Sequence, residues 1–285
     1  MPKVSIVIDS TANLPEVLIK KFGITVLPLS IIWDGVSYRD GIDLRPEAFY
    51  QRLGASRSLP TTSQVTTPAI QSTFTTLRER GSDVLAIFLS SKFSGTYDAA
   101  LQARETIGAA QSNIAVVDSR LTIMAMGLPV LAAARAASAG ESLASCTRIA
   151  EEARDCSGVL FVVETLEFLR RGGRIGGAQA LLGTVLNIKP VLAMRDGQIE
   201  ALERIRTKRL ALDRMLDIVA ERVGARTPVR LATCHADAAA EAQALLDAAA
   251  ARLHPVETFC TPLSPVIGAH VGPGTVALAY MTGMP

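Results

Sequence analysis

Residues 84–89 form a continuous apolar run, Val-Leu-Ala-Ile-Phe-Leu, which ends abruptly at Ser90-Ser91. Six consecutive apolar residues match a strand that is buried on both faces, as in a parallel sheet covered by helices. Ser94-Gly95-Thr96 then leads into a predicted helix over 97–107. In such sheets ligands bind beyond the carboxyl ends of the strands, where the amides of a following helix favour an anion. The stretch predicts an α/β fold with an anion site in this turn; a turn that only caps the helix is the alternative.

The first thirty residues predict a βαβ unit. A β-branched strand over 3–8 is followed by a helix that starts near Pro15 and stops at Gly23, and by a second strand over 24–29. This order implies a parallel sheet with a right-handed crossover. Asp9-Ser10 would lie at the carboxyl end of the first strand, either at the ligand or as a helix cap.

A second group of hydroxyls, Thr61-Thr62-Ser63, lies in a predicted loop one helix and one strand before the turn at 90–96. In an open parallel sheet, two such loops can converge over the same strand ends. Before this loop, Asp-Gly pairs predict a hairpin over 30–45, and a short helix is expected over 46–53. The other elements predicted in this half are helices over 68–80, 122–139 and 142–155 and a strand over 113–117.

The second half is predicted to form a separate α/β domain. We place the boundary between 155 and 156, which gives domains 1–155 and 156–285 with the ligand site between them. A strand is expected over 159–163, and Asp196-Gly197 predicts a hairpin between strands over 187–194 and 198–206. The fold class is therefore α/β: an N-terminal α/β/α domain with a parallel sheet and a C-terminal domain with a mixed or antiparallel sheet.

Two further segments suit ligand recognition. Residues 170–176 (Arg-Arg-Gly-Gly-Arg-Ile-Gly) join guanidinium groups to flexible backbone, which suits a carboxylate or phosphate, although a solvated basic loop is the alternative. His270 stands between small residues and before Gly272-Pro273-Gly274, so its imidazole is expected to be accessible. Arg204 and Arg206 form, with neighbouring cations, a basic face that suits an acidic partner protein or is simply solvated.

Composition excludes several function classes. The net charge of +2 and the 5% aromatic content give no sign of a nucleic-acid partner. We expect no signal peptide from residues 1–10, and the sequence shows no apolar stretch long enough for a membrane span and no metal-binding or nucleotide-binding motif. The four cysteines are scattered, which indicates reduced thiols in a cytoplasmic protein.

Seven segments, in this order, resemble the DegV family of fatty-acid-binding proteins over nearly the whole chain. They are Asp9-Ser10-Thr11-Ala12-Asn13-Leu14, Pro60-Thr61-Thr62-Ser63-Gln64, residues 90–97, Val117-Asp118-Ser119, Arg171-Gly172-Gly173-Arg174-Ile175, Asn187-Ile188-Lys189-Pro190 and His270-Val271-Gly272-Pro273-Gly274. The resemblance implies two α/β domains, a long-chain fatty acid such as hexadecanoate between them, and no catalysis or cofactor. It also implies a separate kinase that makes an acyl phosphate for phospholipid synthesis.

The resemblance also implies roles for individual residues. The carboxylate would be held by Thr62, with Thr61 and Ser63 as close alternatives, and by Ser94 of Ser94-Gly95-Thr96. Arg174 and His270 would lie near the head group, and Arg206, or Arg204, would dock the kinase. Two departures matter: Lys92-Phe93 is bulkier than expected at the pocket mouth, and Val271 replaces a small polar residue.

Two other functions compete with this one. Ser94 and His270 could serve a hydrolase, although GxSxG is absent and no acid is placed to orient His270. The second is a small-polyol-binding component of a kinase, in which a histidine engages the substrate; a long apolar pocket would argue against it.

Overall fold

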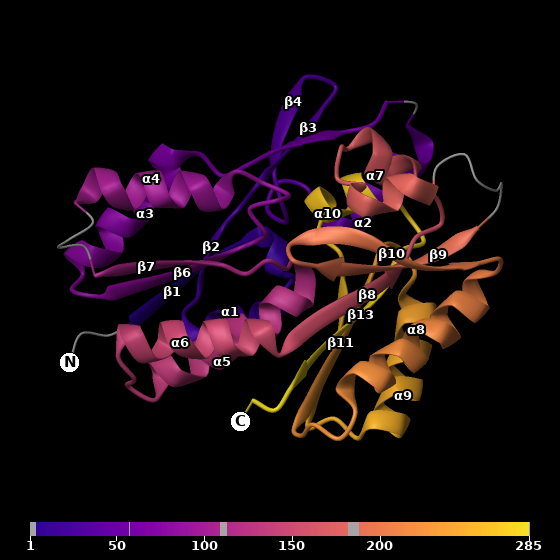
Figure 1. Ribbon diagram of the computed structural model, residues 1–285. Coiled ribbons are helices and arrows are strands. Elements are labelled where there is room, and N and C mark those ends of the chain that lie inside the picture. Colours follow the sequence, from indigo (N-terminus) through magenta and orange to yellow (C-terminus); the bar gives the residue numbers. More distant parts are fainter. Residues whose placement is uncertain (1–3, 57, 109–112, 182–187, 285) are drawn as a thin grey trace.

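The computed structural model describes residues 4–56, 58–108, 113–181 and 188–284. Two sheets dominate it (Figure 1). The first contains β1 (Val4–Asp9), β2 (Thr25–Leu27), β6 (Asp83–Phe88) and β7 (Ile114–Asp118) in the order β2-β1-β6-β7. The second contains β8 (Ser157–Val162), β9 (Lys189–Arg195), β10 (Gln198–Ile205), β11 (Val229–His235), β12 (Glu257–Pro262) and β13 (Val276–Thr282) in the order β10-β9-β8-β13-β11-β12.

Strand pairing confirms the predicted fold class. Every pair in the first sheet is parallel, and all six residues of β6 are buried. The second sheet is mixed, because only β11 and β12 run parallel. The β9–β10 hairpin turns at Asp196-Gly197 as predicted, while Asn187 lies outside the described residues.

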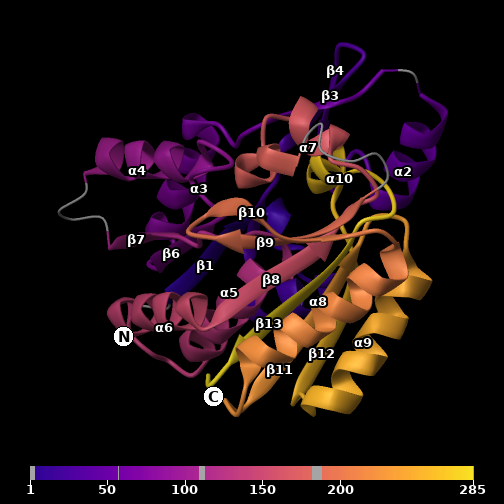
Figure 2. The same ribbon diagram turned by 45° about the vertical axis from the view of Figure 1, so that its right-hand side comes forward.

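The helices form three layers that cover the faces of the two sheets. One face of the parallel sheet is covered by α3 (Thr67–Glu79) and α4 (Thr96–Ile107), and the other by α5 (Ile123–Ser138) and α6 (Leu143–Asp155) (Figure 1). The outer face of the mixed sheet is covered by α8 (Lys208–Val223) and α9 (Ala239–Leu253) (Figure 2).

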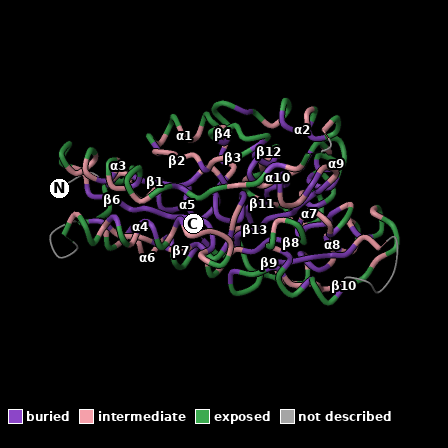
Figure 3. Tube along the Cα trace, turned by 90° about the horizontal axis from the view of Figure 1, so that it is seen from above, coloured by how far each residue is buried: buried purple, intermediate pink, exposed green. Residues whose placement is uncertain are grey.

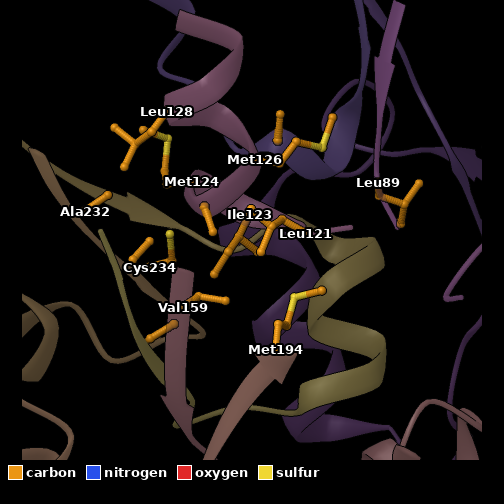
Figure 4. Packing of buried hydrophobic residues seen from close by; sticks show 14 of the residues in the cluster. Leu89, Leu121, Ile123, Met124, Met126, Leu128, Val159, Met194, Ala232 and Cys234 are labelled. Carbon is orange, nitrogen blue, oxygen red and sulfur yellow. The ribbon is translucent and has the colours of Figure 1, made fainter. Parts of the chain in front are cut away.

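Helix α5 packs against both sheets. Every residue from Ile123 to Ala134 is buried, as expected for a helix that is apolar all round. Its neighbours include Ala232 and Cys234 of the mixed sheet (Figure 4), and it also contacts β1. Figure 3 shows buried segments running through the middle of the molecule from one sheet to the other. The boundary at 155/156, between α6 and β8, stays a prediction.

Several short elements differ from the sequence-based expectation, among them the 3-10 helices η1 (Ser10–Ala12) and η3 (Gly176–Leu181), which were not predicted, and two elements near the cavity. Residues 61–63, predicted as a loop, are strand β5 (Thr61–Ser63), which pairs with β3 (Ser30–Trp33) beside β4 (Val36–Arg39) in a small antiparallel sheet. Residues 265–271, for which no helix was predicted, form α10 (Pro265–Val271). The remaining elements are α1 (Glu16–Phe22), α2 (Pro46–Ala55) and α7 (Glu167–Arg171).

Within the described ranges, no helix combines the length and apolar character that crossing a bilayer requires. All four cysteines are free thiols. A cytoplasmic location stays a prediction.

Candidate functional site

A cavity of about 380 Å³ lies between the carboxyl end of the parallel sheet and the inner face of the mixed sheet. This volume is within the range of small-molecule pockets. Most of its wall is apolar, contributed by β8, β9, β13 and the segments that follow β6 and β7. Leu89, Ile123, Val159 and Met194 converge on it (Figure 4). An apolar ligand would therefore be enclosed by both halves of the chain.

The polar part of the wall centres on Thr62 and His270. The Thr62 Oγ1 atom lies 2.8 Å from the Nε2 atom of His270, which joins β5 to α10. The Nδ1 atom of His270 is buried without a hydrogen-bond partner. A proton on Nδ1 would be an orphaned buried donor, so the tautomer protonated at Nε2 is favoured. Nε2–H then donates to Thr62, whose hydroxyl proton is left to bind an anion.

His270 is held neutral. Burial, assisted by the positive charge of Arg174, lowers its pKa to about 4. The backbone at Gly172 makes this burial possible, since a Cβ atom there would lie 2.1 Å from Nδ1 of His270. The imidazole is therefore a hydrogen-bonding group in this site and contributes no charge at neutral pH.

Arg174 supplies the positive charge. It follows α7, and its guanidinium donates to the carbonyl of Phe93 through Nε (3.1 Å) and Nη2 (2.9 Å) and to the carbonyl of Gly172 through Nη1 (2.7 Å). A guanidinium has five N–H donors, so two remain. No acidic residue lines the cavity among the described residues, and Arg174 pairs with none. The wall therefore carries a cation that no acidic residue of the described chain neutralises.

The turn before α4 brings Ser94 and Gly95 to the cavity wall, where Gln64 lies beside Gly95 and Ser63 also contributes. The close approach of this turn to Gln64 depends on Gly95, because a Cβ atom there would lie 2.2 Å from Gln64 Oε1. The Ser94 hydroxyl lies 2.9 Å from the hydroxyl of Thr96.

Two of the expected binding residues lie outside the cavity wall. Thr96 is fully buried, and its hydroxyl accepts from the Val65 amide at 3.3 Å. Thr61 is exposed on β5 and does not line the cavity, although its neighbours Thr62 and Ser63 do. Of the eight residues expected around the head group, Thr62, Ser63, Ser94, Gly95, Arg174 and His270 line one cavity.

Asp9 caps the short 3-10 helix η1. It does not cap α1, the helix considered for it from the sequence, whose N-cap residue is Pro15. The Asp9 carboxylate accepts from the amide and hydroxyl of Thr11 and from the amide of Leu89. Burial raises its pKa to about 6, and these hydrogen bonds oppose the rise. Asp9 does not line the cavity.

The expected docking cations lie on the surface. Arg204 is at the end of β10 and Arg206 directly follows it; both are exposed and neither pairs with an acid in the described chain. Arg170 and Arg171, by contrast, both pair with Glu167.

The geometry does not favour the competing functions. The hydroxyl of Ser94 bonds to Thr96 and that of Thr62 bonds to His270, so a Ser94–His270 pair is not formed. No carboxylate orients Nδ1 of His270, as a hydrolase triad would require. A largely apolar cavity of this size also exceeds what a three-carbon polyol needs.

Sequence reasoning missed several wall residues. Gln64 and Phe93 line the cavity, and neither is among the ligand-binding residues that the sequence predicts. The apolar wall carried no signal of its own, because a cavity-lining Val or Phe on a strand has the pattern of a core residue.

Comparison with known proteins settles the family. A family model described as "uncharacterised protein, DegV family" matches residues 3–283. This chain belongs to the DegV family. A DegV domain-containing protein of Clostridium perfringens is 34% identical over 97% of this chain and 98% of its own. One of Streptomyces coelicolor is 37% identical over 96% and 97%.

Solved DegV structures share the fold. A fatty-acid-binding DegV family protein from Thermus thermophilus superposes with a TM-score of 0.91 at 33% identity, covering 98% of this chain and 99% of its own. DegV from Bacillus subtilis, described as a fatty acid binding protein, gives 0.90 at 30% identity, covering 99% and 100%.

Proposed function

We propose that this chain binds a long-chain fatty acid, with its carboxylate at Thr62, Ser94, Arg174 and His270 and its acyl chain against the apolar wall. The observation that carries the proposal is Arg174, a guanidinium that no acidic residue of the described chain pairs with, at the polar end of a largely apolar cavity. Such a wall favours a ligand with one anionic group and a long apolar body. The fatty-acid binding described for the relatives from Thermus and Bacillus supports the same ligand class.

The energetics fit this ligand. Burying a chain of about sixteen carbons releases on the order of 12 kcal/mol at about 0.8 kcal/mol per CH₂. A carboxylate loses its hydration in the same step and must regain hydrogen bonds. The two remaining Arg174 donors and the Thr62 and Ser94 hydroxyls can supply them.

We infer further that the chain is a carrier without catalysis of its own, which presents the acid to a separate kinase for acyl-phosphate formation in phospholipid synthesis. The absence of a Ser–His–acid arrangement supports a binding role over hydrolysis. Arg206, with Arg204 beside it, is the proposed docking point, since both are exposed and unpaired.

Organic extraction of the purified protein, followed by mass spectrometry, tests the ligand class. We expect a fatty acid to be released in near-equal molar amount, and the delipidated protein to bind hexadecanoate or oleate again in calorimetry. Folded protein that yields a clean extract and binds neither acid would contradict the proposal.

A further inference from the structure

Asp40 is a buried carboxylate just outside the cavity. It follows β4 and is only 2% exposed. Its Oδ2 atom accepts from the Ser10 hydroxyl at 2.6 Å, and its Oδ1 atom accepts from the Val266 amide at 3.1 Å. Neither donor is charged, and no cation in the described chain pairs with Asp40. Burial raises the pKa of Asp40, and these two hydrogen bonds, together with the nearby Ser264 hydroxyl, oppose the rise. A buried carboxylate without a cationic partner depends on such neutral donors.

These hydrogen bonds connect two walls of the cavity. The Ser10 hydroxyl accepts from the amide of Leu29 at 3.2 Å, and Leu29 lines the cavity. On the other side Val266 lies in the first turn of α10 and also lines the cavity. Val266 and His270 are four residues apart, so they share one face of that helix.

Helix α10 depends on contacts of this kind for its position. It has seven residues, too few for a helix to be stable alone. Two contacts with Tyr50 of α2 also tie it to the N-terminal half: the Tyr50 hydroxyl donates to the Leu263 carbonyl, just before the helix, at 3.1 Å, and a Cβ atom at Gly268 would lie 2.6 Å from the Tyr50 oxygen. Within the C-terminal half it packs against α7. Asp40 is the anchor that bonds to the helix backbone itself.

We propose that Asp40 is a positioning residue for ligand binding: through the Val266 amide it fixes α10 and so holds His270 against Thr62. The inference deepens the proposed function and rests on it for its effect on affinity. The effect of Asp40 on the position of His270 can be measured without any ligand. It also assigns a role to Ser10, which anchors Asp40 and does not line the cavity.

The test compares Asp40→Asn with Asp43→Asn. Asp43 is three residues away and hydrogen-bonds only to Arg39, so it is a matched control. The first readout is the NMR titration of His270 in delipidated protein, with His235 and His254 as internal references. We expect the pKa of His270 to rise from about 4 towards the ordinary 6.5 in Asp40→Asn only. The second readout is hexadecanoate affinity, expected to fall about tenfold in the same variant.

The outcomes separate the two proposals. A folded Asp40→Asn protein with the wild-type His270 titration overturns the positioning role, whether or not the protein binds a fatty acid. Wild-type protein that binds no fatty acid overturns the proposed function, while the titration still decides the role of Asp40. If Asp40→Asn does not fold, Ser10→Ala removes one of the two donors and should shift His270 in the same direction; an unchanged titration in that variant also overturns the role.

Discussion

Thr62 and His270 are separated by 208 residues in the chain, yet their side chains meet at 2.8 Å in the cavity wall. The contact joins a short edge strand of the N-terminal half to a short helix of the C-terminal half. In the tautomer protonated at Nε2, the Thr62 hydroxyl proton is free to donate to an anion, while burial and the charge of Arg174 keep the imidazole neutral. The proposed anion site is therefore assembled only when the two halves are in place.

Removing the Thr62 hydroxyl should weaken fatty-acid binding. Thr62→Val keeps the side-chain shape and loses one hydrogen bond to a carboxylate, which contributes about 1.5–3 kcal/mol, or about 10- to 100-fold in affinity. Calorimetric titration with hexadecanoate measures this loss of affinity. Thr61→Val is the matched control, because Thr61 is adjacent but outside the wall; equal affinities for the two variants would contradict the assignment.

His270 should make stability depend on pH. Its pKa is about 4 in the folded protein and about 6.5 when unfolded, so between these values the unfolded chain binds more protons. Folding is therefore penalised at low pH, and the penalty disappears as the pH rises through 6.5. Wild-type stability, measured relative to His270→Gln by urea unfolding, should increase by up to about 3 kcal/mol from pH 4 to pH 7. A constant difference between the two proteins would show that His270 is not buried neutral.

Gly172→Ala should displace His270. The added Cβ atom would meet Nδ1 at 2.1 Å, so the imidazole has to leave Thr62. We expect about a tenfold loss of fatty-acid affinity, the equivalent of one hydrogen bond. Gly54→Ala in α2 is the control: nothing lies within 4 Å of its Cβ position, and alanine is the better helix former, so binding should not change.

Ala277→Leu should shorten the preferred acyl chain. Ala277 is buried on β13 and lines the apolar wall, so three added carbons take up space in a cavity of about 380 Å³. Mass spectrometry of the co-purified lipid should show a shift to shorter acids. An unchanged lipid profile in a variant with the wild-type melting temperature would mean that the acyl chain does not reach β13.

Arg206→Glu should reduce acyl-phosphate formation by the proposed partner kinase without changing the affinity for the fatty acid. Reversing an exposed charge at a docking surface changes association with an oppositely charged partner. Acyl-phosphate formation with the partner kinase should fall at least about tenfold, while hexadecanoate affinity stays at the wild-type value. Arg195→Glu is the control, since Arg195 is at the opposite end of the β9–β10 hairpin. Equal turnover for both variants would rule out Arg206 as the docking point.

The sequence pointed to more of the polar wall of the cavity than of its apolar wall, for a physical reason. Thr62, Ser94, Arg174 and His270 stand out because hydroxyl, guanidinium and imidazole groups among glycines do not form core. Val159 and Phe161, by contrast, alternate along β8 as any buried strand residues do. Only the positions of the surrounding elements show that these two side chains face a cavity.

The fold was predicted well where elements are long and periodic. The six-residue run of β6 and the apolar helix α5 were recognised, whereas β5 and α10 were missed. A three-residue strand and a seven-residue helix depend on their neighbours for stability, so their own residues carry little signal.

The position of α5 has a consequence for how the molecule unfolds. The buried cluster around this helix contains side chains from both sheets. Separating either sheet from α5 would therefore expose one face of the helix to water. The two halves are thus a single cooperative unit, and a calorimetric scan should show one transition rather than two. A chain cut at 155/156 would leave α5 with one face uncovered, and we expect each fragment to aggregate rather than fold.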